Sequence, residues 1–511
     1  MEMNKNSEMN YDVVIVGAGP IGLILGILLQ RSGIKTLIAE KRSSRSIQSK
    51  ASAINAYSLS ILKSLGLIEK FYKNGLVIQD LSLHWKENRI SHVDYRRLPT
   101  EFNNILCLSQ PEVEYILEEH YLSLNGEIIR NLELINFIDH NHSIESYFTE
   151  HKKYISKYLV GCDGVKSTVR ELANIQFNGN DVGVDLIMCD CQIEENPSFD
   201  MKTVYYFVNE NNFSVIIPLE KNIHRIYIKR ESEDSKKDFP HTLDYFQMLL
   251  NKYGLNRLKI NNLKWISQVE FYYRLAEKYI SGNVFLCGDA AHVFPPLGGL
   301  GMNTGFQDSL ALAWRLINSI KKTKIKSNLI EYENERRMLA SELIKRTVTT
   351  AKVISRIDTS ENINSIWLPK MSNRNQLANI LPLAYSGLSQ SYESMTRETT
   401  SYLVGKLVPC FKVANGNCHS LSYEYIDAEN FIFFYQDACS VDFKTILKKY
   451  ASIKCVNISK NKFFDRKLKQ PNLPNAFLMR PDGIICAEIN TDNTSENLLK
   501  IEEYIKEHIH A

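Results

Sequence analysis

A strand, a glycine-rich turn, a helix and a second strand follow one another near the start of this chain. Tyr11–Val16 is apolar and rich in β-branched residues, which is typical of a buried parallel strand. A helical stretch, Leu23–Arg31, and a second strand, Thr36–Ala39, come after the turn, and Glu40 ends that strand. The turn between the first strand and the helix has the pattern Gly-x-Gly-x-x-Gly and consists of Gly17, Ala18, Gly19, Pro20, Ile21 and Gly22.

Each glycine of this turn has a physical reason in a dinucleotide site. Gly17 permits the tight turn, Gly19 lets backbone approach a pyrophosphate, and Gly22 allows a helix to pack closely on a strand. The helix N-terminus offers free N–H groups to the phosphates, and Glu40 can accept hydrogen bonds from a ribose. A turn that only packed a helix on a strand would not require the acid. We therefore predict dinucleotide binding, and the turn alone leaves NAD and FAD open.

Two further strands end in an acidic residue. Tyr158–Cys162 is followed by Asp163-Gly164, and Val284–Cys287 by Gly288-Asp289. After the second of these strands, Pro295–Asn303 is a glycine-containing loop that opens a long helix. Ligands of open α/β sheets bind at the carboxyl ends of strands, so position alone makes Asp289 a candidate. Asp163-Gly164 fits a common structural turn equally well.

Together the three motifs resemble those of the single-component FAD-dependent aromatic hydroxylases, the family of para-hydroxybenzoate hydroxylase and phenol hydroxylase. The resemblance extends over essentially the whole chain. It implies FAD as cofactor, NAD(P)H as reductant, O2 as co-substrate and a small aromatic substrate. In these enzymes a flavin C4a-hydroperoxide transfers oxygen to an electron-rich ring. The resemblance thus implies a monooxygenase that hydroxylates a phenolic or polyketide-like compound.

The resemblance also assigns residues to the cofactor. Asp289 would bind the ribityl chain, Asp163 would serve FAD and NAD(P)H, and Gln110 matches a glutamine that contacts the cofactor. Lys50 stands where the family usually has arginine, and it keeps the charge without the guanidinium fork. A helix dipole at the flavin's pyrimidine edge would stabilise the anionic reduced form. The residues expected around that edge are Pro296, Gly299, Gly301, Met302 and Asn303. The residues expected to flank the phosphate and ribose contacts are Pro20, Ile21 and Lys41.

The expected fold class is α/β, with three kinds of domain. Residues 1–180 and 276–400 form a Rossmann-like FAD-binding domain in two parts. Between them, residues 181–275 alternate apolar and polar positions and predict an inserted β-sheet substrate domain. Residues 401–511 resemble the thioredoxin-like C-terminal domain of the polyketide hydroxylase branch. That region has no Cys-x-x-Cys pair, so we expect a structural role, with a homodimer interface as one option.

The composition excludes several other classes of protein. A net charge of +3 without a Lys/Arg cluster gives no footprint for nucleic acid or an anionic membrane. The 10 cysteines include no Cys-x-x-Cys pair and no adjacent histidine cluster, so we expect no metal site and reduced thiols in the cytoplasm. The apolar run Val13–Leu29 is too short and too rich in glycine to span a bilayer.

The catalytic residue stays unassigned, because a flavin carries the chemistry and no Ser/His/Asp set is visible. His292 lies beside Asp289 in sequence, and we interpret it as structural support more readily than as a base. A non-catalytic flavoprotein that sequesters a pathway intermediate is the main alternative. A flavin-dependent halogenase would carry a Trp-x-Trp-x-Ile-Pro helix, and a separate NAD domain would need a second glycine turn; the sequence contains neither.

Overall fold

The computed structural model describes most of the chain between residues 10 and 489. The ranges are 10–45, 53–86, 88–194, 199–209, 213–220, 222–229, 240–296, 298–321, 327–355, 382–392, 403–415, 418–436, 453–458, 474, 476–489, 499 and 503.

An eight-stranded sheet forms the centre of the FAD-binding domain. Its main order is β19-β20-β11-β1-β2-β8, and β10 and β9 extend it from β11. The five strands from β20 to β8 run parallel, as the strand–turn–helix–strand pattern predicted. The strands are β1 (Tyr11–Val16), β2 (Thr36–Glu40), β8 (Glu127–Arg130), β9 (Leu134–Asp139), β10 (Ile144–Phe148), β11 (Lys153–Gly161), β19 (Ile280–Ser281) and β20 (Val284–Leu286).

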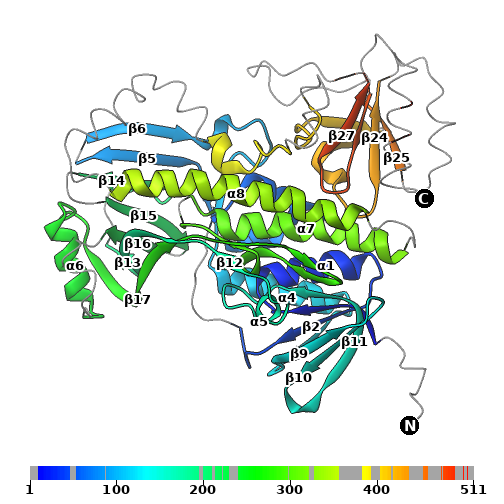
Figure 1. Ribbon diagram of the computed structural model, residues 1–511. Helices are drawn as coiled ribbons and strands as arrows, with labels where there is room; N and C mark the ends of the chain where they lie inside the picture. The colour runs from blue at the N-terminus through cyan, green and yellow to red at the C-terminus, as the bar shows by residue number, and fades with distance from the viewer. Residues whose placement is uncertain are drawn as a thin grey trace.

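Helices cover this sheet and connect it to the rest of the molecule. α1 (Pro20–Arg31) packs between α4 (Gln110–Ser123) and α7 (Leu300–Lys321), and its residues from Gly22 to Leu29 are all buried. α8 (Ser327–Ser355) lies beside α7. Both helices cross the molecule between the two further sheets described below, a seven-stranded sheet and a C-terminal sheet (Figure 1). Shorter helices are α2 (Ala56–Ser64), α3 (Ile68–Asn74), α5 (Thr168–Leu172) and α6 (Leu243–Lys252).

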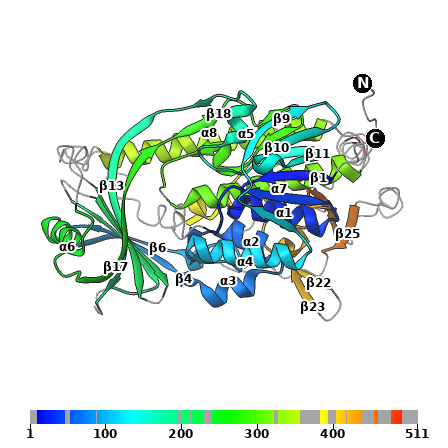
Figure 2. The ribbon, with the colours of Figure 1, turned by 90° about the horizontal axis from the view of Figure 1, so that it is seen from below.

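A second, seven-stranded sheet has the order β17-β13-β16-β15-β14-β5-β6. The inserted segment contributes five strands. β5 and β6 come from within residues 1–180, for which the sequence predicted only the FAD-binding domain. β5 joins because it pairs in parallel with β14. α6 covers the outer face (Figure 2). The strands are β5 (Asp80–Trp85), β6 (Asn88–Asp94), β13 (Asp181–Ile193), β14 (Thr203–Val208), β15 (Phe213–Glu220), β16 (Ile223–Lys229) and β17 (Ile260–Tyr272).

Three small sheets join these parts. Two border the region between the main sheets, and the third is a hairpin near the C-terminal sheet. They are β3 (Ala53–Ile54), β7 (Ile105–Cys107) and β4 (Leu76–Ile78); β12 (Phe177–Asn178), β18 (Arg274–Ala276) and β21 (His292–Val293); and β22 (Lys412–Asn415) with β23 (Cys418–Leu421).

The C-terminal sheet has the order β25-β24-β26-β27. β24 (Phe431–Tyr435) runs parallel to β25 (Ile453–Asn457) and antiparallel to β26 (Ala476–Met479), which pairs with β27 (Ile485–Ile489). Its apolar residues belong to the same hydrophobic cluster as those of the main sheet. The expected boundary near residue 400 therefore does not separate two independent cores.

A buried ion network joins the C-terminal sheet to α7 and α8. Arg480 donates to both carboxylate oxygens of Glu335, at 2.6 and 2.9 Å, and Arg315 donates to Glu335 at 2.7 Å. Asp482 accepts from Arg480 Nε at 3.0 Å and from Trp314 Nε1 at 3.1 Å. Burial disfavours the charged form of Glu335, but the two arginines outweigh it and lower its pKa to about 2. The network is thus ionised at neutral pH.

Within the described residues, no helix is both long and apolar enough to cross a bilayer. The same residues contain no group of three or more His, Cys, Asp or Glu side chains that could hold a metal ion.

Candidate active site

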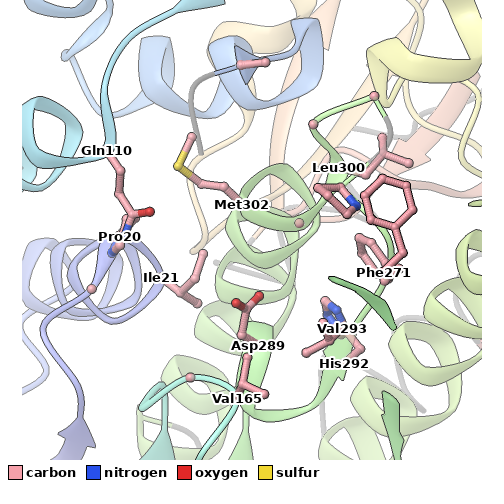
Figure 3. Close-up of a pocket in the computed structure, with 18 of the residues that line it drawn as sticks. Pro20, Ile21, Gln110, Val165, Phe271, Asp289, His292, Val293, Leu300 and Met302 are labelled. Carbon is pink, nitrogen blue, oxygen red and sulfur yellow. The ribbon is translucent and has the colours of Figure 1, made fainter. Parts of the chain in front are cut away.

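A cavity of about 890 Å³ extends from the glycine turn after β1 to the inner face of the second sheet. Figure 3 shows Asp289, Ile21 and Met302 at the end nearer the glycine turn, and Phe271 and Leu300 further along. Most of the residues predicted to bind the cofactor meet in its lining, although they are scattered along the sequence. They are Gly17, Gly19, Pro20, Ile21, Glu40, Lys41, Gln110, Asp163, Asp289, Pro296, Gly299, Gly301 and Met302.

Two predicted residues among those that the structure describes do not line the cavity. Gly22 has a packing role, because a Cβ there would lie 2.0 Å from the carbonyl oxygen of Gly17. The side-chain amide of Asn303 donates to the carbonyls of Ala53 and Gly299, at 2.8 and 2.6 Å, and a contact of this residue with the flavin stays a prediction. Its Oδ1 accepts from the backbone N–H of Asn55 at 2.9 Å, so these bonds brace the glycine loop. Lys50 lies outside the described residues.

The turn before α1 has the geometry of a phosphate cradle. Gly17 has φ +106°, and a Cβ there would lie 2.5 Å from the Cys162 carbonyl oxygen, so only glycine fits. Gly19 caps α1 without a side-chain hydrogen bond, and Pro20 occupies the first turn. A Cβ on Gly19 would meet no atom within 4 Å. This open space in front of unpaired helix N–H groups suits a pyrophosphate.

Glu40 lies beside this turn and is held in place by hydrogen bonds. Its Oε2 accepts from Ala18 N–H at 2.8 Å, and Oε1 accepts from both the backbone N–H and Nε of Arg42 at 2.9 Å. Burial raises the pKa of Glu40, but the bonds from Arg42 and Ala18 outweigh burial and lower it. Arg42, which also lines the cavity, was missed by sequence reasoning, although its place two residues after the acid was a usable signal.

Asp163 both faces the cavity and stabilises the turn that follows β11. It lines the cavity, and its Oδ2 accepts from Val169 N–H at 3.1 Å near the start of α5. Burial raises the pKa of its carboxyl. The neighbouring Arg170 donates to the Ala290 carbonyl at 3.0 Å and so ties this segment to the turn that carries Asp289.

Asp289 lies in a short helical turn, Gly288–Ala290, that follows β20. Gly288 has φ +65°, a conformation that favours glycine. Its N–H donates to Asp308 at 3.3 Å. The side chain of Asp289 extends into the cavity between Ile21 and Val165 (Figure 3). A carboxylate in this position can accept hydrogen bonds from hydroxyl groups of a bound ligand.

His292 is held by a buried acid on α7. Its Nε2 lies 2.6 Å from Asp308 Oδ2, and both side chains are fully buried. Burial raises the pKa of Asp308, but Arg336 and His292 outweigh burial and lower it; Arg336 Nε donates to Asp308 at 2.6 Å. The ring of His292 stacks on Phe294, with centroids 5.3 Å apart. This arrangement favours the interpretation of His292 as support, and Asp308 had no signal in the sequence.

The other end of the cavity is apolar and aromatic. The second sheet and β7 supply most of its lining, and none of their described lining residues carries a charge. Tyr385 closes this region beside the glycine loop, where a Cβ on Gly298 would lie 2.3 Å from its ring. The lining here consists of Leu81, Leu83, Ser91, Val93, Tyr95, Ile105, Cys107, Leu186, Val204, Tyr206, Val208, Phe213, Val215, Ile217, Tyr227 and Phe271.

Comparison with known proteins identifies the family. The sequence matches the profile of the FAD binding domain family over residues 10–347. The chain belongs to this family. The 12-dehydrotetracycline 5-monooxygenase/anhydrotetracycline 6-monooxygenase of Streptomyces rimosus is 30% identical over 360 residues, covering 68% of this chain and 70% of that protein. The family match and this relative place the chain among the FAD-dependent aromatic monooxygenases, in a polyketide and tetracycline hydroxylase-like group.

Solved structures agree with this assignment over nearly the whole chain. The OxyS anhydrotetracycline hydroxylase from Streptomyces rimosus superposes with a TM-score of 0.80 and 25% identity, covering 98% of this chain and 99% of that one. An aklavinone-11 hydroxylase, solved as a ternary complex with FAD and aklavinone, shares the fold with a TM-score of 0.78 at 19% identity, covering 97% and 99%. The C-terminal segment of this FAD-dependent monooxygenase is therefore part of a shared overall fold.

Replacing Asp289 by alanine in this monooxygenase is expected to weaken FAD binding about ten- to a hundredfold. A hydrogen bond to a charged group contributes about 1.5–3 kcal/mol. A misplaced flavin would also shelter its reactive oxygen poorly, so more H2O2 should form per NADPH consumed. A flavin titration and the ratio of NADPH consumed to product formed are the measurements. Wild-type affinity and full coupling in the variant would contradict this role for Asp289.

Proposed function

We propose that the protein uses NAD(P)H and O2 to hydroxylate a bulky, uncharged phenolic or polyketide-like aromatic compound. One observation carries the proposal: the phosphate cradle at the glycine turn and the apolar, tyrosine-rich end of the cavity belong to one continuous space. We call the apolar end, lined by the second sheet, β7 and Tyr385, the chamber. A benzoate-like substrate would need a cation to balance its carboxylate in such an apolar site. None of the described chamber residues provides one.

The residues at the cofactor end fit FAD in the following way. The N-terminus of α1 and Gly19 would hold the pyrophosphate, Glu40 would accept from the adenosine ribose, and Asp289 would accept from the ribityl hydroxyls. The start of α7, at Leu300, would place the positive end of a helix dipole at the pyrimidine edge of the ring. When bound, FAD supplies the activation of O2 and the transfer of one oxygen atom.

The chamber would contribute orientation and exclusion of water. An aromatic ring that buries its surface here gains about 25 cal/mol for each Å² of apolar area removed from water. The second sheet and Tyr385 would hold the ring against the cofactor end and keep water from competing with the substrate. No proton-transferring residue is assigned by this geometry.

A substrate screen on the FAD-loaded protein tests the proposal. Polycyclic phenols and 4-hydroxybenzoate are compared, with NADPH and NADH, for stimulated coenzyme oxidation, O2 uptake and a product heavier by one oxygen atom. We expect stimulation by polycyclic phenols and little by 4-hydroxybenzoate. Tight binding of the phenols without coenzyme oxidation or product would favour the sequestering alternative. A chlorinated product formed only with chloride would indicate a halogenase.

For the C-terminal segment we propose a thioredoxin-like fold with a structural role. The order β25-β24-β26-β27, a parallel pair continued by an antiparallel hairpin, supports this fold, and the missing Cys-x-x-Cys pair excludes thiol–disulfide catalysis of the thioredoxin type. The free thiols of the described cysteines support a cytoplasmic location. A homodimer is a further proposal, and light scattering of the FAD-loaded protein tests it.

A further inference from the structure

Glu114 is a buried acid on α4, the helix that packs against α1. The residue is 1% exposed, and Leu117 and Tyr121, which follow it along the same face of the helix, are buried as well. Burying a carboxylate is unfavourable unless hydrogen bonds or an opposite charge compensate it. Sequence reasoning did not single out Glu114, yet it lines the same cavity as Gln110 and Glu40.

The groups that compensate Glu114 also lie at the cofactor end of the cavity. Gln110 is one turn earlier on α4, and its Nε2 donates to Glu114 Oε1 at 2.9 Å. Residues four apart share a helix face, so the helix itself brings the two side chains together. Arg42 is the opposite charge: its hydrogen bonds with Glu40 contribute most to its raised pKa, and the charge of Glu114 adds to the rise. Gln110, Arg42 and Glu114 all line the cavity.

The carboxylate of Glu114 determines which end of the Gln110 amide faces the cavity. A side-chain amide has a donor nitrogen and an acceptor oxygen, whereas a carboxylate only accepts. Glu114 therefore holds the nitrogen, and the oxygen is left for a ligand; Figure 3 shows this oxygen on the side of Met302. An ionised phosphate has no hydrogen to donate, so the group that matches this oxygen is a hydroxyl or an N–H.

We propose that Glu114 is a positioning residue for FAD, which orients the Gln110 amide so that Oε1 accepts a hydrogen bond from a ribityl hydroxyl. The inference rests on the proposed function for the placement of FAD in this cavity. Asp289 would accept from the same chain, so acceptors on two separate elements, α4 and the turn after β20, would hold it. Holding the ribityl chain at two points limits how far the flavin ring can move relative to the chamber.

The first test is a double-mutant cycle on FAD affinity. Gln110→Met and Glu114→Met remove the hydrogen bond and keep an unbranched side chain that suits a helix. Full-length holoprotein of each variant is diluted, and the rise in flavin fluorescence on release gives the dissociation constant of FAD. We expect each single variant to bind FAD about three- to tenfold more weakly. The double variant should bind no more weakly than Gln110→Met, because Glu114 acts through Gln110.

A second test exchanges the donor and the acceptor. Gln110→Glu alone places two carboxylates in contact and should weaken FAD binding, because like charges repel strongly in a buried site. Adding Glu114→Gln restores a donor–acceptor pair and leaves an oxygen of residue 110 for the cavity, so most of the lost affinity should return. Glu112→Met is the matched control. Glu112 lies in the first turn of α4 but is not among the residues that line the cavity, so FAD affinity should not change.

Three results would overturn the inference. Glu114→Met could keep wild-type affinity; the losses of the two single variants could multiply in the double variant, which would mean that they act independently; or the exchange variant could bind FAD no better than Gln110→Glu. If Glu114→Met does not fold, the exchange variant decides alone. The proposed function is judged separately by the substrate screen. A chain that hydroxylates phenols but shows multiplying losses would refute only the inference, and the reverse result would refute only the hydroxylation.

Discussion

Replacing Gly19 by valine is expected to abolish FAD retention while the protein still folds. Gly19 has φ −77° and ψ 178°, which any residue adopts, and a Cβ there meets no protein atom within 4 Å. The added side chain would instead fill the space where the pyrophosphate approaches the backbone. We expect the purified variant to be colourless and to bind FAD at least about a hundredfold more weakly, the equivalent of about 2.7 kcal/mol.

A matched control for this variant is Gly33→Asn, at the other end of α1. Gly33 has φ +71° and open space around it, and asparagine tolerates this conformation better than other non-glycine residues. The control should stay yellow. Absorbance of the purified proteins, FAD titration and a thermal melt of each apoprotein separate loss of cofactor from loss of fold. A Gly19→Val protein that retains FAD would show that the phosphates lie elsewhere.

Removing residues 403 onward is expected to prevent folding of the remaining chain. The sequence alone predicted a separate C-terminal domain over residues 401–511 with a structural role. The structure leads to a different expectation. Truncation would remove Arg480 from Glu335 and Asp482 from Arg315, and it would expose the apolar surface around Trp314. Each large apolar side chain that loses its burial costs about 1.5–3 kcal/mol, against a typical total stability of about 5–15 kcal/mol.

A pair of point variants tests the same idea without truncation. Arg480→Ala should destabilise the whole protein by about 3–5 kcal/mol, with loss of FAD in the same thermal transition. Lys454→Ala removes an exposed ion pair with Asp427 and should cost less than about 1 kcal/mol. Denaturant unfolding, followed by flavin fluorescence and by Trp emission, gives both values. Two separate unfolding transitions in wild type, or a soluble truncated protein that binds FAD, would contradict the expectation that the C-terminal segment and the FAD-binding domain unfold as one unit.

The sequence by itself determined the cofactor end of this protein. Gly17, Gly19 and Glu40 lie within a single strand–turn–helix–strand unit, so their geometry follows from local backbone rules that a sequence pattern expresses directly. Asp163 and Asp289 could be predicted for a related reason, because parallel strands that each end in an acid place those acids at the same edge of the sheet. The glycine loop before α7 was predicted in the same way, and the side chain of Asn303 in the first turn of α7 braces that loop.

Only the tertiary structure decided the chamber and the C-terminal contacts. β5 joins the second sheet by pairing with β14, which is far away in the sequence, and no local pattern encodes that choice of neighbour. Asp308 supports His292 from another element, and Arg225 on β16 binds Asp190 on β13 because the two strands are neighbours in the second sheet. Arg480 contacts Glu335 across 145 residues. Side-chain burial and pairing of this kind depend on which surfaces meet when the chain collapses, and that is a property of the whole fold.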